Sequence, residues 1–116
     1  MKVYAYNKCD SCRRALRFLD QQKIQYEFLD ITEQAPTKKE LELMLEKVGE
    51  IKKLFNTSGV VYKEMNLSEK LPKLSKAEMI ALLASNGRLV KRPFLIAKDI
   101  ALVGFKEAEW QQAFRS

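Results

Sequence analysis

The chain has 116 residues, of which 47% are hydrophobic and 31% charged, and its net charge at pH 7 is +6. This length predicts one domain over residues 1–116 with a core large enough to fold without disulfide or metal staples, and the composition excludes a disordered chain. No apolar run approaches the roughly 20 residues of a membrane span, and the basic residues are spread along the chain beside acidic neighbours, which argues against direct nucleic-acid binding.

The first third of the sequence predicts a βαβ unit. Residues 3–6 and 26–31 are rich in strand-forming side chains. Between them, apolar residues recur at the i, i+3, i+4, i+7 spacing of an amphipathic helix that ends near Gln22. Two strands joined in this way by a helix are expected to be parallel, with a right-handed crossover.

The middle of the sequence, about residues 37–86, predicts a helical insertion. Two capping boxes, Thr37-Lys38-Lys39-Glu40 and Ser75-Lys76-Ala77-Glu78, each begin a helix with an apolar face. The first of these helices is expected to end at Gly49. Shorter helical pieces are expected between residues 51 and 74.

The C-terminal part predicts a β-hairpin and a closing helix. Two short apolar runs, residues 94–97 and 100–103, are separated only by Lys98-Asp99, as in a two-residue hairpin, and residues 106–114 are typical of a helix. The element order is therefore βαβ, a helical insertion, then ββα. This is the layout of the thioredoxin fold, so we predict an α/β chain with a thioredoxin-like fold and an inserted helical subdomain.

Cys9 and Cys12, the only cysteines, form a CxxC pair where the first strand gives way to the first helix. Unpaired N–H groups and the dipole at a helix start favour an anion, so Cys9 should be held as a thiolate, with Arg13 close by. Cys12 lies on the apolar stripe and should be the more buried thiol. These positions predict that Cys9 attacks and that Cys12 resolves the mixed disulfide.

Two other interpretations of the cysteine pair remain. The residues could be ordinary buried thiols, because free cysteine is a common core residue. A zinc site needs about four ligands, and this chain has two thiols and no histidine, so only a site shared between subunits would serve. We therefore expect no bound metal and no organic cofactor. A cysteine pair without a secretion signal also indicates the reducing cytoplasm.

Arg92-Pro93 comes just before the predicted hairpin. An ordinary trans proline at the start of a strand is one interpretation, since only about 5–6% of X–Pro bonds are cis. The other is a cis bond that packs Pro93 against the cysteines and directs Arg92 at Cys9.

These segments together resemble the arsenate reductase family of the glutaredoxin-linked type, including its CxxC-bearing relatives. The resemblance is carried along the whole chain by Asn7-Lys8-Cys9-Asp10-Ser11-Cys12-Arg13-Arg14, Pro36-Thr37, Phe55-Asn56-Thr57-Ser58-Gly59, Lys91-Arg92-Pro93 and Val103-Gly104-Phe105-Lys106-Glu107. It implies a thioredoxin-like fold with an inserted helical bundle, a nucleophile at Cys9 and a cis proline at Pro93. It also implies that Arg13 and Arg92 stabilise the thiolate or a bound anion.

The sequence also departs from this family. Arsenate-reducing members hold the oxyanion with several arginines, whereas this chain has Lys53-Leu54-Phe55-Asn56 and Val103-Gly104-Phe105 where two of them are expected. Those members also take their second thiol from glutathione, whereas this chain supplies Cys12. A desolvated arsenate needs two or three charge-assisted donors, so we expect weak oxyanion binding.

A second resemblance is to the Spx-type regulators, which share the CxxC and Arg-Pro segments. This resemblance implies binding to the α-subunit of RNA polymerase, and Gly49 matches a glycine of that binding surface. Spx-type chains continue as a basic tail beyond the last helix, where this sequence stops at Ser116, so we expect regulation to be the weaker alternative.

The sequence thus predicts a cytoplasmic thiol-disulfide oxidoreductase that acts on a small thiol or disulfide, or on arsenate. Glutathione with glutaredoxin, or thioredoxin, would return the Cys9–Cys12 disulfide to dithiol. The alternatives are a redox-sensing regulator that binds RNA polymerase and a genuine arsenate reductase.

Overall fold

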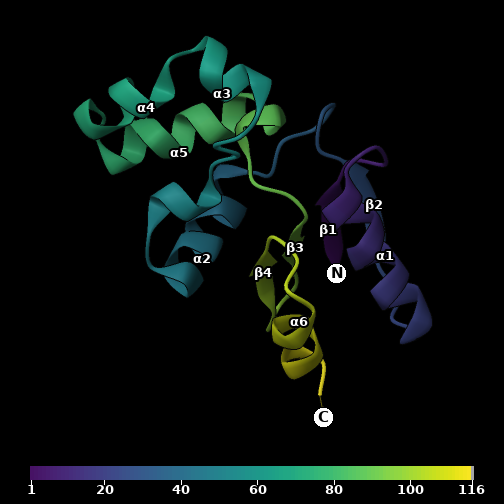
Figure 1. The fold of residues 1–116 in the computed structure, drawn as a ribbon. Coiled ribbons are helices and arrows are strands. Elements are labelled where there is room, and N and C mark those ends of the chain that lie inside the picture. Colours follow the sequence, from purple (N-terminus) through teal and green to yellow (C-terminus); the bar gives the residue numbers. More distant parts are fainter. Residues whose placement is uncertain (116) are drawn as a thin grey trace.

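A four-stranded mixed sheet lies at the centre of the structure, a computed structural model that describes residues 1–115 (Figure 1). The strand order is β2-β1-β3-β4; β1 is parallel to β2 and antiparallel to β3, and β3 is antiparallel to β4. The strands are β1 (Lys2–Ala5), β2 (Glu27–Asp30), β3 (Phe94–Ile96) and β4 (Ala101–Val103). This arrangement confirms the predicted parallel pair, the hairpin and the α/β fold class.

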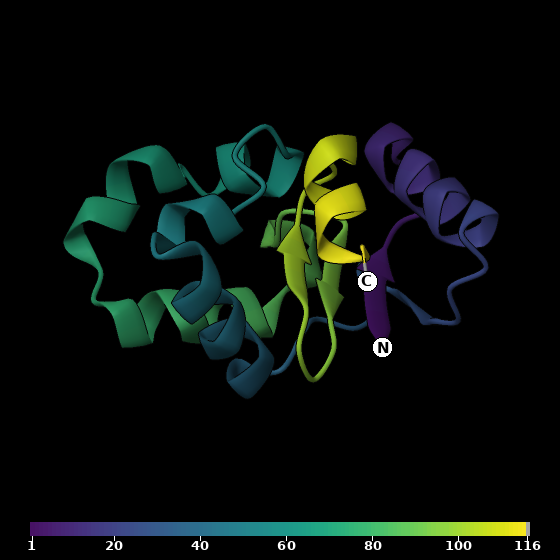
Figure 2. The same ribbon diagram turned by 90° about the horizontal axis from the view of Figure 1, so that it is seen from below.

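Helices cover both faces of this sheet. One face packs against α1 (Asp10–Gln21) and α6 (Glu107–Ala113), and the other faces the helices between β2 and β3 (Figures 1 and 2). These helices are α2 (Lys38–Val48), α3 (Val60–Glu64), α4 (Leu67–Lys70) and α5 (Lys76–Ser85), with 3₁₀ turns at Ile51–Leu54, Leu71–Lys73 and Gly87–Leu89. No helix in the described part of the chain is both long and apolar enough to cross a membrane.

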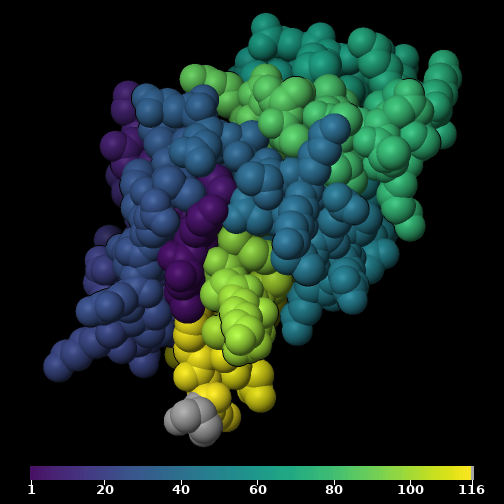
Figure 3. All heavy atoms as spheres, turned by 180° about the vertical axis from the view of Figure 1, so that it is seen from behind, coloured from purple at the N-terminus to yellow at the C-terminus, as the bar shows by residue number. Residues whose placement is uncertain are grey.

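The helical insertion extends the molecule along one direction. The overall dimensions are 42 × 27 × 22 Å. Seen from behind in Figure 3, the green and teal helices stand at the upper right, the yellow C-terminal segment lies at the bottom, and the purple N-terminal segment runs from the upper left to the middle. The insertion packs against one face of the sheet, through the buried cluster that contains Tyr4 and Phe94.

Local signals of the sequence produce the elements that they predict. In both capping boxes the reciprocal bonds form: the Thr37 hydroxyl accepts from the N–H of Glu40, and the Ser75 hydroxyl accepts from the N–H of Glu78. In the hairpin, the Ala97 N–H donates to the carbonyl of Ile100 at 2.8 Å across a two-residue loop. The first strand ends one residue earlier than predicted, since the Tyr6 carbonyl accepts the Cys9 N–H in a turn.

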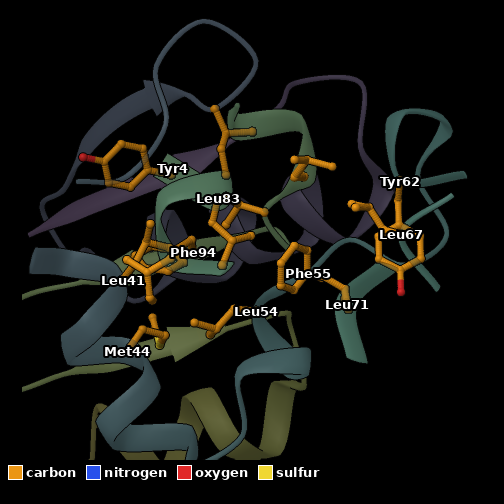
Figure 4. Close-up of a cluster of buried hydrophobic side chains, with 14 of the residues drawn as sticks. Tyr4, Leu41, Met44, Leu54, Phe55, Tyr62, Leu67, Leu71, Leu83 and Phe94 are labelled. Atoms are coloured by element: carbon orange, nitrogen blue, oxygen red, sulfur yellow. The ribbon is translucent and has the colours of Figure 1, made fainter. Parts of the chain in front are cut away.

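Two buried clusters form the core, one on each face of the sheet. The larger joins the sheet to the insertion; Figure 4 shows Tyr4, Leu41 and Phe94 beside one another, with Phe55 and Tyr62 further out among the insertion helices. The smaller lies under α1 and α6 and contains Val3, Ala5, Cys12, Ala15, Phe18, Leu19, Leu95, Leu102 and Trp110. The buried Trp110 indole N–H donates to the Gly104 carbonyl at 3.0 Å, so its polar atom is satisfied.

Substitutions at Gly87 and Gly49 compare two reasons for glycine: lack of space for a side chain at Gly87 and a positive φ at Gly49. A Cβ at Gly87 would lie 1.8 Å from the Ile31 carbonyl oxygen, a contact that backbone atoms cannot relieve. We expect Gly87→Ala to lower the free energy of unfolding by about 3 kcal/mol or more. Gly49 has open space around it and a φ of +80° as the cap of α2, so Gly49→Ala should cost only about 1–2 kcal/mol.

Urea unfolding followed by circular dichroism measures both values. Equal losses in the two variants would contradict the assignment of Gly87 to a close backbone approach.

Candidate functional site

Cys9 lies at the junction of β1 and α1, as the N-cap residue of the helix. Its N–H donates to the Tyr6 carbonyl at 3.1 Å, and its carbonyl accepts from the N–H of Arg13 at 2.9 Å. With φ −98° and ψ 124° the residue is extended, so the chain turns into the helix immediately after it. This position exposes the thiol to the unpaired amides and the positive end of the helix dipole.

The surroundings of Cys9 favour its thiolate. Its sulfur lies 3.2 Å from the Ser11 hydroxyl oxygen, and the side chain is only partly exposed. Partial burial raises the pKa of Cys9, but hydrogen-bond donors of Ser11, Cys12 and Arg92 outweigh that effect and lower the pKa below its usual value. Cys9 is therefore the thiol that ionises first.

Cys12 has the opposite character. It is fully buried in the cluster under α1, one helical turn after Cys9. The pKa of Cys12 is raised to about 12, mainly by burial and further by the hydrogen bond and the negative charge of Cys9. The predicted difference in burial between the two thiols is thus present, and both are free in the structure.

The Arg92 guanidinium lies beside the Cys9 thiol, and the next residue is Pro93. The Arg92–Pro93 peptide bond is cis, as the family resemblance implied. The Arg92 guanidinium stacks over the Tyr6 ring, with its carbon 5.2 Å from the ring centroid, and it is one of the donors that lower the pKa of Cys9. A cation held against an aromatic face is fixed in orientation, so Tyr6 positions Arg92 beside the thiol.

The other charged residues of the motif are placed differently. Arg13 is exposed on the first turn of α1, and it is not among the groups that shift the pKa of Cys9; its role at the site stays a prediction. Asp10 forms an ion pair with Arg14 at 3.2 Å, and the Arg14 guanidinium also lies 5.7 Å from the Phe105 ring centroid. Each of these two side chains therefore screens the effect of the other on the thiolate.

Sequence reasoning missed two residues of this site, Ser11 and Tyr6. Ser11 occupies one of the two variable positions of the CxxC motif. A hydroxyl at that position could have indicated a hydrogen-bond donor to the Cys9 thiol. Tyr6 had no comparable signal, because its contact with Arg92 depends on how two distant strands pair. No group of three or more His, Cys, Asp or Glu side chains gathers as a metal site within residues 1–115.

A groove of about 870 Å³ opens next to the thiol. Ser11 and Arg92, both hydrogen-bond partners of Cys9, line one part of it, and Lys53, Lys91 and Lys106 also face it. The structure thus brings basic residues from distant parts of the chain to one surface beside Cys9.

A thioredoxin-like fold with two cysteines, Cys9 and Cys12, at the start of its first helix defines the class of this protein. A model of the ArsC family matches residues 4–113. The chain belongs to the ArsC family.

The similar proteins cover nearly the whole chain. An uncharacterised protein of Bacillus subtilis, YusI, is 44% identical over 97% of this chain and 96% of its own length. An ArsC family related protein from Bacteroides fragilis has a solved structure with 44% identity and a TM-score of 0.90, covering 97% of this chain and 95% of that one. A possible arsenate reductase from Streptococcus mutans has 39% identity and a TM-score of 0.88, covering 97% of each chain.

Regulators also occur among the relatives. The regulatory protein MgsR of Bacillus subtilis is 26% identical over 94% of this chain and 86% of its own length. The relatives of this chain thus include a possible arsenate reductase and a regulatory protein.

The role of Ser11 can be tested by thiol titration. Removing its hydroxyl takes a donor from the thiolate, so Ser11→Ala should raise the pKa of Cys9 and slow its alkylation at pH 7 several-fold. Alkylation rates between pH 5 and 9, with the modified cysteine identified by mass, measure this effect. Ser85→Ala, on the exposed end of α5, is the matched control.

In the wild-type protein, alkylation in this pH range should modify Cys9 and leave Cys12 intact, because the pKa of Cys12 is raised to about 12. Equal labelling of both thiols, or an unchanged rate in Ser11→Ala, would contradict the assigned roles.

Proposed function

We propose that this protein is a thiol-disulfide oxidoreductase in which Cys9 is the nucleophile and Cys12 the resolving thiol. The observation that carries the proposal is the contrast between the two sulfurs. One is partly exposed with a lowered pKa, and the other is buried, one helical turn away, with a pKa raised to about 12. Two ordinary core thiols would both be buried and neutral.

The proposed reaction moves two electrons to the substrate. The Cys9 thiolate attacks one sulfur of a substrate disulfide; a mixed disulfide forms, and the second substrate sulfur leaves as a thiolate that takes a proton from water. Cys12 then loses its proton and attacks the Cys9 sulfur, which releases the first substrate sulfur as a thiol. The substrate disulfide is reduced to two thiols, and a Cys9–Cys12 disulfide remains.

The high pKa of Cys12 suits the resolving role, because the charge of Cys9, which contributes to that high pKa, is lost during the reaction. Burial is the largest cause, and the hydrogen bond and charge of Cys9 come next. Once Cys9 is in a mixed disulfide its negative charge is gone, so the pKa of Cys12 falls at that step. The nearby Arg92 charge, which lowers the pKa of Cys12, remains in place.

The reductant that we propose is glutathione with glutaredoxin, or thioredoxin, acting in the cytoplasm. Either would attack the Cys9–Cys12 disulfide and return both thiols to the reduced state. The donors that lower the pKa of Cys9 also make its sulfur a good leaving group in this step, since low-pKa thiols leave faster. The reaction uses no metal and no bound cofactor.

A genuine arsenate reductase is the first alternative, and the similarity to the possible arsenate reductase of Streptococcus mutans favours it. The groove beside Cys9 offers the guanidinium of Arg92, whereas its other cations are lysine ammonium groups. Lysine binds an oxyanion as a point charge and lacks the bidentate fork of arginine. We therefore propose weak arsenate binding.

A redox-sensing regulator is the second alternative, and the similarity to MgsR favours it. In that case the Cys9–Cys12 disulfide would form once in response to oxidation, and the oxidised protein would bind the α-subunit of RNA polymerase. Gly49, the predicted contact of that kind, lies at the exposed end of α2 and takes the left-handed conformation that ends the helix. Co-purification with RNA polymerase under oxidation, without turnover, would support this alternative over catalysis.

Cysteine variants test the roles of the two thiols. Cys9→Ser should abolish reduction of a small disulfide such as hydroxyethyl disulfide, because the remaining thiol, Cys12, is buried and its pKa is raised to about 12. Cys12→Ser should accumulate a mixed disulfide at Cys9, visible as an added mass that a reductant removes. If the mixed disulfide accumulates in Cys9→Ser and not in Cys12→Ser, the roles of the two thiols are reversed. Normal turnover in both variants would contradict the proposed function.

Arsenate is tested in a coupled assay with glutathione, glutaredoxin, glutathione reductase and NADPH. We expect no arsenate-dependent NADPH oxidation above that of Cys9→Ser, while the oxidised wild-type protein becomes about two mass units lighter as the Cys9–Cys12 disulfide forms. Arsenate turnover that depends on Cys9 would establish the reductase and contradict the argument from missing guanidinium groups.

A further inference from the structure

Strand β4 has one open edge. It pairs with β3 on one side and with no strand on the other within the described chain. The Ala97 N–H donates to the Ile100 carbonyl and the Gly104 N–H to the Pro93 carbonyl, each at 2.8 Å. In an antiparallel pair such bonds occur at every second residue, so the N–H and C=O groups of Ala101 and Val103 point away from β3.

The groove beside Cys9 runs along this edge. The whole segment 99–106 lines it, with Lys47, Val48 and Lys53 of the insertion on one side and Glu109, Gln112 and Ala113 of α6 on the other. Figures 1 and 2 show β4 on the side of the sheet that faces the insertion, with α6 close by. At the end of the strand nearest Gly104, the lining includes Ser11 and Arg92, the partners of the thiol.

The groove carries an excess of positive charge. Five basic side chains line it, against the two carboxylates of Asp99 and Glu109. The two ion pairs within residues 1–115 involve none of these seven charged side chains. Asp99 belongs to the hairpin turn, at the opposite end of β4 from Gly104, whereas a Cβ at Gly104 would touch the Lys91 side chain at 2.9 Å. Lys91 and Arg92 therefore lie at the end of the groove near the thiol, and Asp99 lies at the other end.

We propose that this groove binds an extended acidic peptide segment of a disulfide-bearing protein, which adds as a fifth strand beside β4 and brings its disulfide to Cys9. The inference rests on the proposed thiol-disulfide exchange and names its substrate class. Strand addition uses the outward backbone groups of Ala101 and Val103, and the lysines match carboxylates of the peptide.

The size and lining of the groove favour a peptide over a small anion. A volume of about 870 Å³ is far larger than a tetrahedral oxyanion needs and lies in the range of sites for much larger ligands. Apolar side chains, among them Val48, Ile100 and Phe105, share the lining with the lysines. A peptide with alternating side chains can use both, whereas an oxyanion can use only the charges.

The docking test uses the Cys9→Ser protein, so that binding is measured without chemistry. The probe is a short fluorescent strand-forming peptide with several Glu residues; its controls carry Gln or Lys at the same positions. At low salt the Glu peptide should bind about tenfold more tightly than the Gln peptide, and this preference should fade at high ionic strength. Lys53→Gln and Lys91→Gln should each weaken binding several-fold, whereas Lys63→Gln, on α3 outside the groove, should not.

Strand addition is tested from both sides. N-methylation of alternate residues of the Glu peptide removes donors needed for pairing and should lower affinity about tenfold. In the protein, Val103→Pro removes an outward N–H at an edge position that tolerates proline, and should weaken binding to a similar degree while circular dichroism shows a folded chain. Because the peptide modification leaves the protein unchanged, it decides the question even if that variant unfolds.

Several results would overturn the inference. They are equal binding of the Glu and Gln peptides, no effect of N-methylation, displacement of the peptide by a single-stranded oligonucleotide, or self-association through β4 that Val103→Pro abolishes. Failure of the proposed function looks different: the Glu peptide binds, but wild-type protein reduces no disulfide and forms no Cys9–Cys12 bond. If only docking is wrong, the wild-type protein still reduces a small neutral disulfide and shows no preference between acidic and neutral peptide disulfides.

Discussion

The pairing of β1 with both of its neighbours is the constraint on which the rest of the structure depends. Val3 and Ala5 point into the cluster under α1 and α6, and Tyr4 points into the cluster shared with the insertion. The antiparallel register places Phe94 opposite Tyr4, so two residues further along Arg92 comes opposite Tyr6. The stacking of Arg92 on Tyr6, and with it the donor beside Cys9, follows from this register.

The sequence predicted those parts of the fold whose cause is local. The two capping boxes, the left-handed glycine at the end of α2 and the two-residue hairpin are determined by neighbouring residues, and each formed where expected. The segment 60–74 was only partly readable. Two short helices meet at Asn66, which has a positive φ of 54°. This backbone conformation depends on tertiary packing, so the hydrophobic pattern of the sequence does not predict it.

The same distinction applies to the site. The CxxC spacing and its place at a strand–helix junction were enough to indicate two thiols of unequal burial, because the helical period puts Cys12 on the buried stripe. Charge was harder to read. Asp10 and Arg14 neutralise each other as an ion pair, and lysines spaced widely in the sequence converge on one groove only when β4, α6 and the insertion assemble. A count of charges along the chain therefore described a solvated surface and missed a basic groove.

The groove and the thiol share Arg92, and this sharing imposes a condition on any acidic substrate. Arg92 helps to keep the pKa of Cys9 low, so a carboxylate that engaged Arg92 would weaken the support of the thiolate just as the substrate arrived. Lys53, Lys91 and Lys106 offer other partners in the same groove. Their ammonium groups can take the carboxylates while the guanidinium stays on Tyr6 and beside the sulfur. A basic groove built mostly of lysine, with one arginine fixed at the thiol, is thus consistent with binding acidic chains and keeping Cys9 reactive.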